Sequence, residues 1–193
     1  MKLSPEVTDS LTLKFAQLAR EKNQAGHKII SLGLGEPEFL TPGSIIEATI
    51  IALRSGFTRY SNPKGLFELR KLIAKKLILE NAIETTPDNI IVTPGAKQAS
   101  MIALMSILEP DDEVINFSPC FVSYIPQIKI AEPESRIHNI DINRKDFSID
   151  WNKVREKANS KTKVIILNSP NNPTGKMLTR YDMDQLISIV NKF

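Results

Sequence analysis

Residues 164–175 read VIILNSPNNPTG, an apolar run followed at once by a polar loop. Four consecutive apolar residues, bounded by turn-forming residues, are typical of a buried strand. The loop holds Pro170 and Pro173, and their restricted backbones fix the directions of Asn171 and Asn172. Open α/β sheets bind ligands beyond the carboxyl ends of their strands, so we expect a ligand-contacting loop here. A Pro/Asn-rich turn without a ligand is the alternative.

Extended and helical signals alternate on the N-terminal side of this stretch. Apolar runs predict strands at residues 89–93, 113–117, 137–140 and 164–167. Apolar residues at helical spacing predict helices at residues 11–25, 41–53, 66–79, 95–108 and 179–190. Thr41 is the expected N-cap of the second helix, and Pro42 its first residue. The alternation predicts an α/β domain with a mostly parallel sheet.

A second candidate site follows the strand predicted at residues 89–93. The sequence continues Thr93-Pro94-Gly95, and a helix is predicted from there. The first N–H groups of a helix have no acceptor in the preceding turn, and the helix dipole adds positive charge. Such a helix start binds anions, phosphate above all, and Gly95 removes a side chain from the approach. A plain strand-to-helix turn is the alternative.

Two further segments bear on the ligand. Phe121 follows the strand predicted at residues 113–117, where its ring could stack on a flat ligand or pack in the core. Residues 31–38 read SLGLGEPE and resemble a dinucleotide-binding fingerprint. They lack its third glycine, because Glu38 stands there, and no helix is predicted to start at that point. A Rossmann dehydrogenase is therefore excluded.

Composition narrows the function classes. The chain has 193 residues, 41% of them hydrophobic, and a net charge of +3. It contains no apolar run of the roughly 20 residues that span a bilayer, and its N-terminus lacks the apolar core of a secretory signal. One cysteine and two histidines leave no basis for a disulfide framework or a zinc site. We expect a cytoplasmic protein that binds small molecules, with no metal, nucleic acid or membrane partner.

Four motifs in register resemble the aspartate aminotransferase family, class I/II aminotransferases of fold type I that depend on pyridoxal phosphate. They are Gly35-Glu36-Pro37, residues 60–65 (YSNPKG), residues 94–99 (PGAKQA) and residues 172–175 (NPTG). The resemblance implies an α/β fold with a mostly parallel sheet flanked by helices. This fold would be the N-terminal part of the fold type I large domain, in truncated form. It also implies an N-terminal arm and part of the small domain at residues 1–43, and the first half of the cofactor-binding large domain at residues 44–193.

The resemblance implies a role for each matching residue. Gly95, Ala96 and Lys97 would bind the phosphate of pyridoxal phosphate through their backbone. Phe121 would stack on the pyridine ring, and Asn172 would donate to the phenolic oxygen, which favours its deprotonated form. Tyr60 would reach the phosphate of a neighbouring subunit, and Gly35 would leave room for the substrate carboxylate.

The resemblance also implies parts that this sequence does not contain. The lysine that forms a Schiff base with the cofactor has no counterpart here, so no catalytic residue is identified. We expect the N-terminal half of an aminotransferase of the aspartate or aromatic type, which moves an amino group between an amino acid and a 2-oxo acid. Its expected partners are those substrates and a second copy, or a complementing C-terminal chain. The alternatives are a carbon–sulfur lyase on the same scaffold and a non-catalytic remnant or ligand-sensing module.

Other charged and polar residues are expected to have ordinary surroundings. Arg70 and its lysine neighbours on the helix predicted at residues 66–79 should form a solvated face. His138 should lie at a surface or a strand end. Cys120 should be an unreactive, packed residue, because no histidine is placed to activate its thiol.

Overall fold

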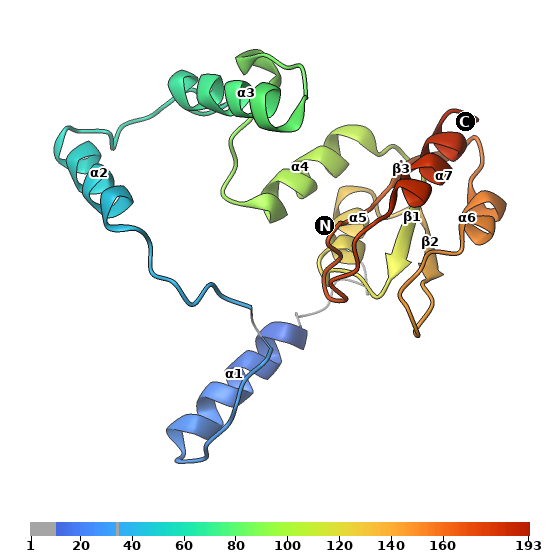
Figure 1. The fold of residues 1–193 in the computed structure, drawn as a ribbon, viewed down its shortest axis with the longest axis horizontal. Helices are drawn as coiled ribbons and strands as arrows, with labels where there is room; N and C mark the ends of the chain where they lie inside the picture. The colour runs from blue at the N-terminus through green and yellow to red at the C-terminus, as the bar shows by residue number, and fades with distance from the viewer. Residues whose placement is uncertain (1–10, 34) are drawn as a thin grey trace. The chain divides into compact units, whose positions relative to one another are not determined.

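The computed structural model describes residues 11–33 and 35–193, which form a helical unit, residues 12–99, and an α/β unit built on residues 100–193 (Figure 1). The helical unit contains α1 (Leu11–Gln24), α2 (Gly43–Arg54), α3 (Phe67–Asn81) and the 3-10 turn η1 (Pro87–Asn89). Helix α4 (Ala96–Ile107) starts in the first unit and ends in the second. The remaining elements of the α/β unit are β1 (Glu113–Ser118), α5 (Tyr124–Ala131), β2 (Arg136–Asp141), α6 (Trp151–Lys157), β3 (Thr162–Ile165) and α7 (Arg180–Val190).

The sheet of the α/β unit has the strand order β2-β1-β3, and both pairings are parallel. The β1–β2 register runs from Glu113 opposite Arg136 to Ser118 opposite Asp141. As the central strand, β1 is buried along nearly its whole length, which explains why Val114, Ile115 and Phe117 are all apolar although they face both sides of the sheet. The parallel α/β fold expected from the sequence is confirmed.

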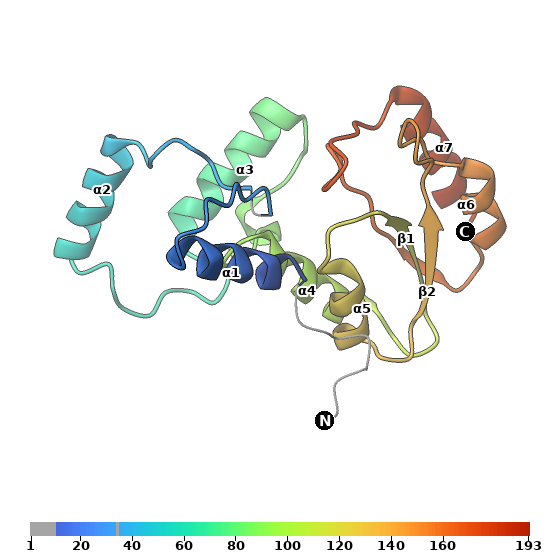
Figure 2. The same cartoon turned by 90° about the horizontal axis from the view of Figure 1, so that it is seen from below.

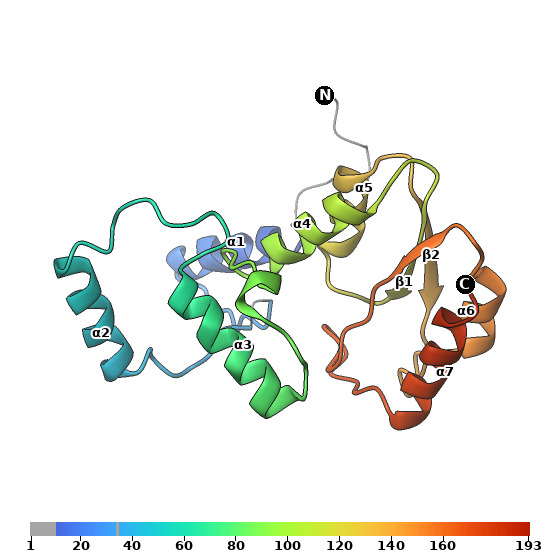
Figure 3. The same ribbon diagram turned by 90° about the horizontal axis from the view of Figure 1, so that it is seen from above.

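Helices cover both faces of this sheet. Successive side chains of β1 point to opposite faces, so each face has its own core. Val114 packs in one core cluster with Leu104, Leu108 and Ile128, from α4 and α5 and their ends. Ile115 packs in the other with residues of α6 and α7, among them Val154 and Ile189. Figures 2 and 3 show α5 on one side of the strands and α6 and α7 on the other.

Two local expectations are wrong, and one helix was missed. Thr41 does not cap α2, because the carbonyl of Pro42 accepts the first helical bonds, from the N–H groups of Ile45 and Ile46. Residues 89–93 form no strand. Part of that segment belongs to η1, and the N–H of Val92 donates to a loop carbonyl, that of Lys64, instead of a neighbouring strand. Helix α5 was not predicted at all; Pro126 lies in its first turn, where proline interrupts no helical hydrogen bond.

A buried polar cluster joins the strands at their amino-terminal ends. The Nε2 atom of His138 lies 2.6 Å from Oε2 of Glu113, and the Asn159 amide donates to the same oxygen at 2.6 Å. Glu113 begins β1, His138 belongs to β2, and Asn159 precedes β3. Of the two positions expected for His138, a surface or a strand end, the surface position is wrong, since only 12% of its side chain is exposed. One carboxylate therefore links all three strands.

We predict that Glu113→Gln lowers the free energy of unfolding by about 2 kcal/mol at neutral pH, because hydrogen bonds to a buried carboxylate are among the stronger ones. The hydrogen bond from Asn159, and then that from His138, hold the pKa of the Glu113 carboxyl below its ordinary value of 4.5. The stabilisation is therefore complete above pH 4.5 and is lost as the pH falls through that value towards the folded pKa.

Urea unfolding of both proteins at neutral pH and at about pH 4 measures this difference. The exposed Glu109→Gln is the matched control and should change little. An equal loss of stability at the two pH values for Glu113→Gln would show that the charge of Glu113 is not what links the strands.

Candidate active site

Two loops of the α/β unit meet at the carboxyl edge of its sheet. The first follows β1 and carries Pro119 and Phe121, and the second follows β3 and carries Asn171 and Asn172. The side-chain amide of Asn171 donates to the carbonyl oxygen of Pro119 at 3.3 Å. Because β1 and β3 are neighbours in the sheet, the two loops leave the same edge side by side.

Asn171 also shapes the loop to which it belongs. Its N–H donates to the carbonyl of Lys176 at 2.8 Å, and its carbonyl accepts from the N–H of Gly175 at 2.7 Å. Its side-chain amide donates to Thr174 Oγ1 at 2.9 Å as well. Asn172 is exposed, so its side chain can reach a ligand without giving up a buried position. Asn171 thus serves the structure, whereas its neighbour is available for binding.

Phe121 is partly buried and has a fixed aromatic neighbour. Its ring centroid lies 5.6 Å from that of Tyr124, edge to face. The Tyr124 hydroxyl donates to Asn168 Oδ1 at 3.4 Å, which ties the start of α5 to the loop after β3. Burial raises the pKa of the Tyr124 hydroxyl, so this group stays protonated and remains a donor at neutral pH. These contacts hold the Phe121 ring at the carboxyl edge of the sheet.

A small hollow beneath these loops is lined by Asn116, Cys120, Tyr124 and Asn171, among others, and measures about 30 Å³. That volume holds roughly one water molecule and excludes an aromatic ring. The buried Asn116 amide donates to Asn139 Oδ1 at 2.8 Å and to the Cys120 sulfur at 3.3 Å. Its own Oδ1 has no hydrogen-bond partner among the described residues. The hollow is therefore too small for a flat aromatic ligand.

Asn116, Tyr124 and the structural role of Asn171 were missed from the sequence. The signal for Asn116 was present, since it is the polar residue inside an otherwise apolar run of β1. A polar residue at a fully buried strand position needs specific partners. Its partners Asn139 and Cys120 come from β2 and from the loop after β1, and the sequence alone does not pair them.

The helical unit contains the predicted phosphate turn at the start of α4. Gly95 has a φ of +81°, and a Cβ atom added there would meet nothing within 4 Å. The N–H of Gly95 donates to the Thr93 carbonyl at 2.8 Å, and the Thr93 hydroxyl donates to the Gly95 carbonyl at 3.0 Å. The turn is thus closed on itself, and α4 begins at Ala96, with Lys97 next. An anion could approach the first N–H groups of α4 without a steric obstacle at Gly95.

The other two predicted residues also lie in the helical unit. Tyr60 is fully exposed in the loop between α2 and α3. Gly35 is exposed and belongs to no helix or strand, and an added Cβ atom would meet nothing within 4 Å. Over residues 11–33 and 35–193, no three His, Cys, Asp or Glu side chains are grouped so that they could hold a metal ion. In the same part of the chain, no helix has both the length and the apolar character needed to cross a membrane.

Comparisons with known proteins identify the family of this chain. The family model for aminotransferase class I and II matches residues 27–193. The chain is 37% identical to an aspartate aminotransferase of Thermotoga maritima over 187 residues, which are 97% of this chain and 49% of that protein. It is 39% identical to an aspartate aminotransferase of Bacillus subtilis, with 96% of this chain and 48% of that protein covered.

A solved structure has the same fold. The aspartate aminotransferase of Thermus thermophilus with maleate superposes with a TM-score of 0.91 at 35% identity, over 100% of this chain and 51% of that one. The chain thus spans about half the length of the curated relatives it matches. With the family model covering residues 27–193, this chain belongs to the class I and II aminotransferases, a family that uses pyridoxal phosphate.

Proposed function

We propose that the protein carrying this chain is an aminotransferase of the aspartate or aromatic type, which moves an amino group between an amino acid and a 2-oxo acid with pyridoxal phosphate. The observation that carries the proposal is the bond from Asn171 to Pro119. It joins the loop of Asn172 to the loop of Phe121 at the carboxyl edge of a parallel sheet, where α/β proteins bind ligands.

The chemistry of these residues fits a phosphorylated, flat aromatic cofactor. In the α/β unit, Phe121 offers a ring face and Asn172 an amide donor. In the helical unit, Gly95, Ala96 and Lys97 form an unobstructed helix start that suits a phosphate. Tyr60 adds an exposed hydroxyl, which we assign to the phosphate of a neighbouring subunit. When bound, pyridoxal phosphate would supply an electron sink for bond cleavage at the α-carbon of the amino acid.

Each residue of this chain then has a distinct task. Asn172 donates to the phenolic oxygen of the cofactor and favours its deprotonated form. Phe121 keeps water from one face of the pyridine ring and holds its orientation. Gly35, which has no side chain, leaves space for the substrate carboxylate. We assign no lysine of this chain to the Schiff base. Lys97, the lysine among the predicted site residues, belongs to the phosphate turn.

The same proposal covers organisation and partners. We propose that residues 1–43 contribute an N-terminal arm and part of a small domain, and that residues 44–193 form the first half of the large domain. The active protein would be a homodimer or would pair with a complementing C-terminal chain, in the cytoplasm. Its substrates would be an amino acid and a 2-oxo acid. Because both relatives are aspartate aminotransferases, aspartate is the first amino donor to test.

We predict that Asn172→Ala weakens the binding of pyridoxal phosphate by about tenfold, the usual effect of losing one hydrogen bond to a charged group. Its free energy of unfolding should stay within about 0.5 kcal/mol of the wild-type value, because the side chain is exposed. Equilibrium dialysis and urea unfolding measure the two quantities on the protein at its natural length. Asn191→Ala, an exposed asparagine after α7, is the matched control and should alter neither.

We also predict transfer of the amino nitrogen itself. Aspartate with an isotopically labelled amino nitrogen, incubated with 2-oxoglutarate and the protein saturated with pyridoxal phosphate, should yield labelled glutamate by mass spectrometry. A carbon–sulfur lyase would instead release ammonia and a 2-oxo acid from a thioether amino acid. A protein that binds the cofactor and transfers nitrogen from no amino acid would contradict the proposal.

A further inference from the structure

Arg70 is the buried cation of α3. Only 5% of this residue is exposed, whereas Lys71, Lys75 and Lys76 on the same helix are exposed. The expectation that all four form a solvated face is therefore wrong for Arg70. A buried guanidinium is costly unless its N–H groups find acceptors, so its partners indicate why it is there.

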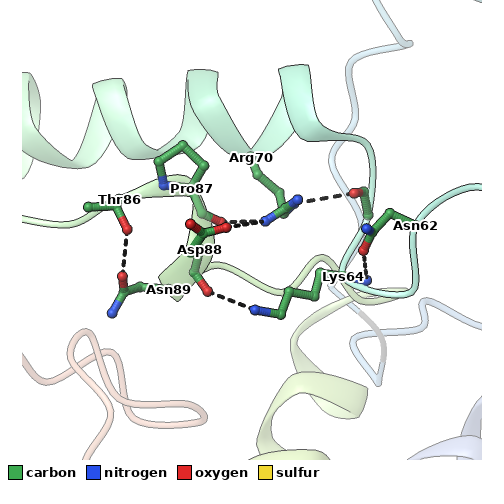
Figure 4. A network of polar contacts seen from close by, with 8 residues as sticks. Asn62, Lys64, Arg70, Thr86, Pro87, Asp88 and Asn89 are labelled. Atoms are coloured by element: carbon green, nitrogen blue, oxygen red, sulfur yellow. Dashed lines mark hydrogen bonds and ion pairs between the residues drawn. The ribbon is translucent and has the colours of Figure 1, made fainter.

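The guanidinium joins two segments that are distant in the sequence (Figure 4). Its Nε donates to the carbonyl of Gly65 at 3.3 Å, and its Nη1 donates to the carbonyl of Pro87 at 2.7 Å. The Asp88 carboxylate lies 3.6 Å from Nη1, but this side chain is 85% exposed and contributes little. Two backbone carbonyls are thus the main partners, one in the loop before α3 and one in η1.

Further contacts hold the same two segments together. The N–H of Val92 donates to the carbonyl of Lys64 at 2.9 Å, and Lys64 Nζ donates to the carbonyl of Asp88 at 3.1 Å. Gly65 has a φ of +98°, and a Cβ atom there would lie 2.8 Å from Val92 Cβ. Asn62 closes the loop locally, because its Oδ1 accepts from the N–H of Lys64 at 2.9 Å.

These two segments lead to the two groups that we assign to phosphate. The loop at residues 61–65 directly follows Tyr60, and the segment at residues 90–92 directly precedes the turn at Gly95. Arg70 itself is buried under carbonyl groups, so any effect it has on a phosphate passes through these segments. Lysine could not replace Arg70, because its single ammonium group lacks the rigid, planar set of N–H donors with which a guanidinium binds two carbonyls in fixed directions.

We propose that Arg70 is a positioning residue for the two phosphate-binding groups of this chain, the Gly95–Lys97 turn for its own cofactor and Tyr60 for the cofactor of a neighbouring subunit. Its guanidinium fixes the loop that presents Tyr60 against the segment that ends in the Gly95–Lys97 turn. This inference rests on the proposed function, and its ligand is the phosphate ester group of the cofactor. Loss of Arg70 should therefore weaken recognition of the phosphate more than recognition of the aromatic ring.

The test compares pyridoxal phosphate with pyridoxal, which has the same ring and no phosphate. In Arg70→Lys, the ratio of the two affinities should fall by about tenfold, the effect of about one weakened hydrogen bond to a charged group. Affinity for pyridoxal should stay unchanged. Lys71→Gln, which removes an exposed cation one position along α3, is the matched control and should leave the ratio unchanged. Equilibrium dialysis of the protein at its natural length measures each affinity.

A second variant guards against misfolding of Arg70→Lys. Lys64→Met removes an exposed side chain that spans the same two segments, and its affinity ratio should shift in the same direction by a smaller factor. Without ligand, Arg70→Lys should also speed amide hydrogen exchange at Gly65 and Val92, with the central strand β1 unaffected.

The outcomes separate this inference from the proposed function. Equal loss of affinity for both compounds in Arg70→Lys, or an unchanged ratio in both variants, would overturn the positioning role and leave the proposed function in place. A wild-type protein that binds pyridoxal as tightly as pyridoxal phosphate would overturn the proposed function, and this inference with it.

Discussion

The burial of β1 on both faces is the constraint on which the rest of the structure depends. A strand between two parallel neighbours has no solvent-facing side, so its alternate side chains enter two separate cores. Helices α4 and α5 close one core, and α6 and α7 close the other. Because all three strands run in the same direction, the loops that follow them leave the sheet at one edge, where Phe121 and Asn172 are placed.

Hydrogen bonds of polar side chains join the chain segments at each end of the sheet. At the amino-terminal end, the Glu113 carboxylate meets His138 and Asn159 and links the three strands. At the carboxyl end, Asn171 ties the loop after β3 to the loop after β1. In the helical unit, the Arg70 guanidinium donates to carbonyl groups of two segments and so joins them. In each case a buried or partly buried polar group joins segments far apart in the sequence.

The sequence predicts the elements with strong periodicity well. The strands at β1 and β2 and the helices α1, α3, α4 and α7 lie within about two residues of expectation, and β3 is shifted by two towards the N-terminus. The errors have physical causes. Burial of Arg70 and His138 depends on partners 17 and 25 residues away, Pro87 and Glu113, and local patterns do not reveal such pairs. The site residues follow from motifs, and their roles remain predictions.

The measurement that tests the central claim most directly is a crystal structure of the protein at its natural length with pyridoxal phosphate bound. If the proposed function is correct, the phosphate lies within about 3 Å of the backbone N–H groups of Ala96 and Lys97. The pyridine ring should then stack on Phe121, with the Asn172 amide on the phenolic oxygen. A cofactor bound away from the carboxyl edge of the sheet, or with its phosphate remote from the start of α4, would contradict the proposed function.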